Sequence, residues 1–220
     1  MAEDAPSETG WRGSPEGWLE AAYEALIDGG IDAVKIMPLA QRLRLSRTSF
    51  YWFFKDREAL LTALLDRWDQ RTTQPLIAAA TAYAETQAEA ILNVIGSFLP
   101  PETFDAKLEF AVRSWALQDA GVMSRLHAAD EHRLTALRDL LMRWGHAPLD
   151  ADVRARTIYL VQMGYISMQQ REPLALRLER IPAYVEIYGG IRPEAREMAR
   201  FHARHSEADD IATSGVAGPS

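Results

Sequence analysis

The sequence predicts an all-α protein. Apolar residues recur at three- and four-residue spacing along most of the chain, which is typical of helices with one buried face. No segment alternates polar and apolar residues as a half-buried strand does, and no unit repeats at a fixed period. A length of 220 residues with 48% hydrophobic residues fits one or two domains with a real core.

The first helix is predicted at 15–28, because Ser14 can cap free backbone amides and Pro15 suits the first helical turn. Gly29 and Gly30 end it. Further helices are expected at 37–43, 46–53, 56–71, 75–99, 104–118, 122–144 and 150–172, with a final pair after Pro182 and Pro193. Short helices followed by longer ones indicate a small domain at 14–58 and a larger bundle at 59–205, between flexible tails at 1–13 and 206–220.

Composition limits the classes of function. The absence of cysteine excludes disulfides, thiolate metal sites and cysteine nucleophiles. No stretch approaches the roughly 18 apolar residues of a membrane helix, and the acidic first residues lack the features of a secretory signal. We therefore expect a cytoplasmic protein that has no membrane partner.

Positive charge is concentrated in one window. Residues 35–57 contain six basic side chains and one acid, a formal charge of +5, whereas the whole chain carries −7. All other residues together therefore carry −12, which argues against general affinity for phosphate polymers but leaves this window as a candidate contact.

Residues 37–53 have the pattern of two helices that cross at a steep angle. In the first, Leu39 and Leu43 share one face, and Gln41 and Arg42 lie on the opposite one. Only two residues separate this helix from the next, a connection typical of a helix-turn-helix, and the second helix follows a natural cap at Ser46.

The second helix has an aromatic inner face and a mixed outer face. The side chains expected inside are Phe50, Phe53 and Phe54, and those expected outside are Arg47, Thr48, Tyr51 and Trp52. A guanidinium, a hydroxyl and amphipathic rings suit base edges, thymine methyl groups and phosphates in a major groove. Lys55 and Arg57 follow at the start of the next helix, where cations and free amides can hold a phosphate. A solvated basic surface is the alternative that this pattern alone leaves open.

The segment LAQRLRLSRTSFYWFFKDREALL resembles the DNA-binding signature of TetR-family transcriptional regulators, and its second half is tetracycline-repressor-like. The resemblance covers Trp18 to about Trp68. It implies a three-helix DNA-binding domain followed by a ligand-binding and dimerisation bundle, in a homodimeric repressor that binds a palindromic double-stranded operator and responds to a small-molecule effector. It assigns base reading or backbone contact to Gln41, Arg42, Ser46, Arg47, Thr48, Ser49, Tyr51, Trp52, Lys55 and Arg57.

Two positions depart from the pattern of that family. Arg44 stands where the turn usually has glycine, so strain is expected if its φ is positive. Met37 and Pro38 occupy the first turn of the leading helix, which makes a base contact from that helix less secure.

The segment 153–168 is apolar around much of its circumference, so we expect it to be covered on two sides. One cover is the core. The other is either a second part of the same chain or a partner subunit, as the resemblance implies, and Gly164 would permit close backbone approach.

The segment 122–144 places Asp130 and Arg133 at core positions, with His127 at the border of the apolar stripe. One interpretation is an internal ion pair of Asp130 with Arg133 or Arg113. The other, which the resemblance favours, is a pocket for an aromatic or amphipathic effector. The residues expected to line such a pocket are Phe110, Arg113, Trp115, His127, Asp130 and Trp144.

Enzyme motifs are absent from the sequence: it contains no Walker loop, Rossmann fingerprint, HExxH or GxSxG. His127 and Asp130 are spaced to act as an acid and base, but no nucleophile accompanies them. His202 and His205 lack an evident third metal ligand. We therefore expect no catalytic activity, metal or cofactor; a helical enzyme that uses His127 and Asp130, or a DNA-binding dimer without an effector, are the alternatives.

Overall fold

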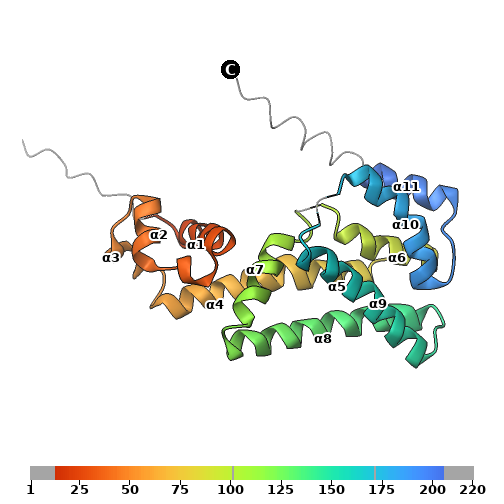
Figure 1. Ribbon diagram of the computed structural model, residues 1–220, viewed down its shortest axis with the longest axis horizontal. Helices are drawn as coiled ribbons and strands as arrows, with labels where there is room; N and C mark the ends of the chain where they lie inside the picture. The colour runs from red at the N-terminus through yellow and green to blue at the C-terminus, as the bar shows by residue number, and fades with distance from the viewer. Residues whose placement is uncertain (1–12, 101, 171, 206–220) are drawn as a thin grey trace, which may run out of the picture. The chain divides into compact units, whose positions relative to one another are not determined.

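The computed structural model describes residues 13–100, 102–170 and 172–205, which form two compact units divided between Asp66 and Arg67. All regular structure in the described ranges is helical, so the predicted all-α class is confirmed (Figure 1). The division falls eight residues later than the domain boundary proposed at 58. The tails expected at 1–13 and 206–220 lie outside the described residues except for Gly13.

The first unit contains α1 (Pro15–Gly29), the 3₁₀ turn η1 (Ile31–Ala33), α2 (Ile36–Leu43), α3 (Arg47–Phe50) and most of α4 (Arg57–Trp68). The hydroxyl of Ser14 accepts a hydrogen bond from the Gly17 amide at 3.0 Å, so the predicted cap begins α1. Trp18 and Phe50 are both fully buried and meet edge to face at 5.3 Å between ring centroids. This aromatic contact joins α1 to α3 and fixes which side of α3 faces outward.

The second unit begins with the end of α4 and the π-helical turn η2 (Asp69–Thr73). It continues through α5 (Gln74–Thr81), α6 (Gln87–Ser97), α7 (Ala106–Ala116), α8 (Ala120–Arg143), α9 (Pro148–Ser167), α10 (Leu174–Gly189) and α11 (Ala195–His205). Helix α8 packs along α9 and also contacts α5 and α7, as Figure 1 shows for α8 and α9. The core of this unit includes Ile91, Leu137, Leu141, Ile158 and Val185.

Two predictions for the second unit differ markedly from the structure. The single helix expected at 75–99 is divided into α5 and α6, because Thr86 caps a new helix by accepting from the Glu89 amide at 3.1 Å. The sequence Thr-x-x-Glu signals such a start. The final pair was expected to begin after Pro182, but α10 begins at Leu174 and continues through Pro182, whose cost is offset by the burial of Ile181 and Val185 beside it.

Candidate nucleic-acid interface and ligand pocket

The turn between α2 and α3 contains Arg44 in the left-handed conformation, for which the sequence analysis expected backbone strain. Arg44 has φ 54° and ψ 39°, and the Leu45 amide donates to the Ala40 carbonyl at 2.9 Å. This bond closes the end of α2 and directs the chain into α3. A residue with a Cβ in this conformation costs roughly 1–2 kcal/mol, so the steep helix crossing is held at the expense of strain.

Two serines form the start of α3. The hydroxyl of Ser46 accepts from the Ser49 amide at 3.3 Å, and the hydroxyl of Ser49 donates to the Ser46 carbonyl at 2.7 Å. Ser49 is buried, so it does not lie on the outer surface where a DNA contact was expected. Its role is to stabilise the beginning of the helix, with Ser46 at the exposed end.

The outer face of α3 and of the turn after it carries Arg47, Thr48, Tyr51 and Trp52, all exposed. The helix itself spans only four residues, fewer than predicted, and the amides of Phe53 and Phe54 both donate to the Phe50 carbonyl at 3.0 Å. Trp52 is 64% exposed. The Arg47 guanidinium donates to the Tyr51 hydroxyl at 3.1 Å. A cation and two exposed rings on one short face form a surface suited to a polyanionic partner.

The remaining basic residues differ in the hydrogen bonds and ion pairs that they make within the fold. Lys55 is exposed. Arg57 donates to the backbone carbonyls of Val34 at 2.6 Å and Ile31 at 3.1 Å, so it closes the end of η1. Arg42 pairs with Glu24 at 2.7 Å on the solvent side of α1, an ion pair that a phosphate can replace at small cost. Gln41 lies exposed beside it.

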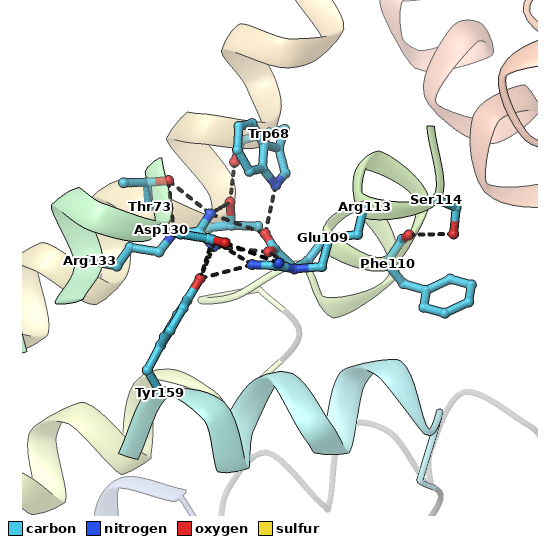
Figure 2. Close-up of polar contacts among 10 residues, drawn as sticks. Trp68, Thr73, Glu109, Phe110, Arg113, Ser114, Asp130, Arg133 and Tyr159 are labelled. Carbon is cyan, nitrogen blue, oxygen red and sulfur yellow. Dashed lines mark hydrogen bonds and ion pairs between the residues drawn. The ribbon is translucent and has the colours of Figure 1, made fainter. Parts of the chain in front are cut away.

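A buried ion cluster lies inside the second unit. We define it as Glu109 and Arg113 of α7, Asp130 and Arg133 of α8, and Tyr159 of α9 (Figure 2). Arg133 Nη1 and Glu109 Oε1 lie 2.9 Å apart, and both side chains are fully buried. Arg113 donates from Nη2 and Nη1 to the two oxygens of Asp130, at 2.6 and 3.2 Å, and from Nε to Glu109 at 2.7 Å. Of the two partners left open for Asp130, Arg113 is the closer, since Arg133 Nη1 lies 3.7 Å away.

The cluster also holds the segment that follows α4. Trp68, the last residue of α4, donates from its indole nitrogen to Glu109 Oε2 at 2.6 Å. Arg133 Nη2 donates to the hydroxyls of Thr72 at 2.8 Å and Thr73 at 2.9 Å, both in the π-helical turn. The ion cluster therefore joins the end of α4 to α7, α8 and α9 within one unit.

Burial and neighbouring positive charges shift the pKa values of Glu109 and Tyr159 in opposite directions. Burial alone would raise the pKa of Glu109, but the charge and hydrogen bonds of Arg133 more than offset it, so the pKa lies below its ordinary value. Burial raises the pKa of the Tyr159 phenol, which therefore stays protonated and donates to Asp130 Oδ1 at 2.6 Å. With two carboxylates and two guanidiniums, the cluster has no net charge.

A pocket of about 350 Å³ adjoins the cluster. Four of the expected residues, Phe110, Arg113, His127 and Asp130, line it together. Sequence reasoning missed the other lining residues, although several follow the same helical faces at three- or four-residue spacing. They are Ser114, Leu117, Met123, Leu126 and Ser167.

Two tryptophans expected in that pocket lie elsewhere. Trp115 is 4% exposed and belongs to the core, because it stands five residues after Phe110 and so points to a different side of α7. Trp144 caps the far end of α8 and lines a separate hollow of about 260 Å³ with Thr81 and Arg143. Of the phenyl and indole side chains expected in the pocket, Phe110 alone is among the described residues that line it.

The alternative chemistries find little support in the described ranges. His127 lies at the pocket beside Asp130, but that carboxylate is occupied by Arg113 and Tyr159. No three histidine or carboxylate side chains there are grouped as a metal ion would require. None of the described helices combines the length and the apolar character needed to cross a membrane.

Residues 19–64 match the family model described as bacterial regulatory proteins, tetR family. The match covers α2, α3 and the turn between them, together with most of α1 and α4. No curated protein matches the sequence.

Solved structures share the fold at low sequence identity. A transcriptional regulator of the TerR/AcrR family from Aquifex aeolicus VF5 is 18% identical with a TM-score of 0.61, over 80% of this chain and 99% of that one. A TetR-family regulator from Rhodococcus sp., 14% identical, has a TM-score of 0.60 over 79% of this chain and 97% of that one. A regulator from Rhodococcus sp. Rha1, 17% identical, has a TM-score of 0.53 over 87% of this chain and 97% of its own.

These structures show the fold of the chain, and the family match covers residues 19–64 of its first unit. Residues 19–64 are therefore similar to the region that the model of tetR-family bacterial regulatory proteins describes.

Proposed function

We propose that this chain is a TetR-family transcriptional regulator, a repressor that binds a palindromic operator as a homodimer and is switched by a small molecule. The observation that carries the DNA-binding part is the exposed face of α3 and the turn after it, in a domain of the matching family. Two such faces, one per subunit, would enter successive major grooves about 34–36 Å apart.

The proposed DNA contacts fall into two groups, those to base edges and those to phosphates or backbone. Arg47 and Thr48, at the exposed start of α3, are assigned to base edges, and Ser46 contributes the capped helix start. Phosphate or backbone contact is assigned to residues around this centre, namely Gln41, Arg42, Tyr51, Trp52 and Lys55. Arg57 is assigned chiefly to holding η1, since two of its nitrogens already donate to carbonyls.

The dimer is assigned to an exposed apolar stripe on α9. Leu149 and Leu160 are 77% and 63% exposed, and Val153 lies between them on the same helical face. Gly164 continues the stripe, and a Cβ added there would have no described residue within 4 Å apart from the backbone of its own helix. Ile187 of the neighbouring α10 is also exposed. An apolar row of this length on a helix that is otherwise packed favours burial against a second copy.

The switch is assigned to the ion cluster. Arg113 and Asp130 line the pocket and also belong to the cluster, whose Glu109 holds Trp68 at the end of α4. The first residues of α4 belong to the DNA-binding unit. A ligand that favours one arrangement of Arg113 over another would therefore bias the end of α4, by as much as it prefers that arrangement.

Selection of bound fragments from randomised DNA, repeated at rising salt, tests the DNA-binding proposal. We expect a palindromic motif that survives competitor DNA. Arg47→Ala should relax the motif at defined positions, whereas Lys107→Ala, an exposed cation of α7, should leave it unchanged. Salt-sensitive binding without a motif would contradict sequence-specific regulation, and equal selectivity of Arg47→Ala and the parent would remove Arg47 from base reading.

Sedimentation of the full chain tests the dimer. Leu160→Asp places a charge in the apolar stripe and should shift the protein to monomer, while Tyr83→Asp, at a site 85% exposed and outside the stripe, should not. A dimer that persists in Leu160→Asp with unchanged affinity would place the subunit contact elsewhere.

A further inference from the structure

We propose that the pocket lined by α7 and α8 takes an uncharged, mainly apolar small molecule with one hydroxyl, phenol or amide group that hydrogen-bonds to the Arg113–Asp130 pair. The proposal rests on the effector pocket of the proposed function and names the chemical class of its ligand.

Charge balance argues against an ionic ligand. Arg113 already lies 2.7 Å from Glu109 and 2.6 Å from Asp130, so its charge is neutralised twice. An anion brought to Arg113 would also approach Asp130, which is held to the same guanidinium by two hydrogen bonds. A cation brought to Asp130 would meet Arg113 and, 3.7 Å from that carboxylate, Arg133. Either ion gains an attraction only by breaking charge-assisted bonds that the fold already makes.

The same pair keeps hydrogen-bonding capacity for a neutral group. Asp130 Oδ1 accepts from Arg113 Nη2 and Tyr159 Oη, both at 2.6 Å, but Oδ2 accepts from Arg113 Nη1 alone within the described part of the chain, at 3.2 Å. A carboxylate oxygen can accept a second bond, and Nη1 carries a second hydrogen. The side chains of Arg113 and Asp130 are 24% and 23% exposed, on the pocket side of a cluster whose other ion pair is fully buried. The open edge of the pair therefore offers an acceptor beside a donor, which suits a group that both donates and accepts.

The rest of the pocket combines carbon surface with the His127 imidazole and the hydroxyls of Ser114 and Ser167. Phe110, Leu117, Met123 and Leu126 supply carbon surface, and the Ser114 hydroxyl donates to the Phe110 carbonyl, which leaves its oxygen as an acceptor. A volume of about 350 Å³ is near the lower end of the roughly 300–1,000 Å³ range of small-molecule sites. A compact ligand of about two fused rings fits these dimensions.

Calorimetry on the full chain with three matched probes tests the ligand class. The probes are 2-naphthylmethanol, 2-naphthoate and 2-naphthylmethylammonium, which share one ring system and differ in charge. We expect the alcohol to bind at least about tenfold more tightly than either ion, because an ion must break a charge-assisted bond to enter. Tighter or equal binding of an ion, or no binding of any probe, would overturn the proposal.

Variants locate the site and its charge. Ser114→Phe narrows the mouth at an exposed position and should abolish binding of the alcohol, whereas Trp144→Ala, in the separate hollow, should leave it unchanged. Asp130→Asn removes one negative charge and should raise the affinity for 2-naphthoate by about tenfold or more, with circular dichroism confirming the fold. Loss of binding in Trp144→Ala but not in Ser114→Phe, or no gain for 2-naphthoate, would refute the assignment.

These measurements contain no DNA, so they stand apart from the regulatory proposal. Absence of a palindromic motif would overturn the repressor while leaving the ligand class intact. A probe that binds in the pocket without altering operator affinity would overturn the effector role and not the chemistry of the site.

Discussion

Replacing Arg133 by methionine tests whether the ion cluster holds the second unit together. Arg133 is fully buried, and its guanidinium makes six hydrogen bonds, to Thr72, Thr73, Tyr159 and Glu109. Methionine keeps much of the volume and removes every one of them. We expect the free energy of unfolding to fall by about 3–4 kcal/mol, near the lower part of the range for breaking a buried ion pair, because Arg113 remains beside Glu109 as a second counter-ion.

Urea denaturation followed by circular dichroism measures this loss, and a mutant cycle assigns it. Glu109→Gln removes the charge but keeps an oxygen to accept from Trp68. Combined with Arg133→Met, it no longer leaves a buried carboxylate short of its partner. The double variant should therefore be more stable than the sum of the single losses predicts, by about 1–3 kcal/mol.

Arg138→Met is the matched control, since it removes an arginine of the same helix that pairs with Asp152 near the surface. Its loss should stay below about 1 kcal/mol. Equal losses for Arg133→Met and Arg138→Met, or single losses that add within about 0.5 kcal/mol in the double variant, would refute the reasoning.

Three further outcomes are expected. Arg44→Gly removes the left-handed strain but makes the unfolded chain more flexible, so urea denaturation should show the first unit stabilised by up to about 1 kcal/mol. A clear decrease in its free energy of unfolding would contradict strain at Arg44. Lys55→Ala should weaken binding to all DNA sequences alike and reduce the slope of log affinity against log salt by about one; a change in the preferred sequence would mean that Lys55 reads bases. The pKa of Glu109 lies below its ordinary 4.5, so its ionisation stabilises the fold above that pH, and this contribution is lost as the pH falls through the lowered pKa. The free energy of unfolding of Glu109→Gln should therefore depend less steeply on pH in the acid range than that of the parent. Identical pH profiles of the two proteins would contradict the lowered pKa.

The features that sequence reasoning obtained correctly are those encoded locally. Ser14 and Pro15 mark the start of α1, and the helical wheel of the second short helix placed Phe50 inside and Arg47 outside, as the structure has them. Polar residues inside an apolar stripe indicated an ion pair at Asp130, because a buried charge needs a partner wherever the chain folds.

The features that it missed depend on contacts between distant segments or on which side of a helix the packing buries. Trp68 and Glu109 are 41 residues apart, and no pattern in either helix announces their hydrogen bond. The resemblance assigned a DNA contact to Ser49, but its side chain is buried and its hydroxyl donates to the nearby Ser46 carbonyl. Trp115 and Trp144 were grouped by residue type, whereas the pocket is defined by which side of α7 and which end of α8 face it.

At the π-helical turn Asp69–Thr73, the contacts with Arg133 depend more on the number of residues in the segment than on the identity of its exposed residues. An i→i+5 turn holds one residue more than an α-helical turn, and its successive side chains are separated by less than the about 100° of an α-helix. That geometry lets two consecutive threonines, Thr72 and Thr73, both reach Arg133. Substitution of the exposed Gln70 should be tolerated, but its deletion would restore an α-helical turn and swing one threonine away. Among relatives that keep the threonine pair and the arginine, this segment should vary in its exposed residues and not in its number of residues.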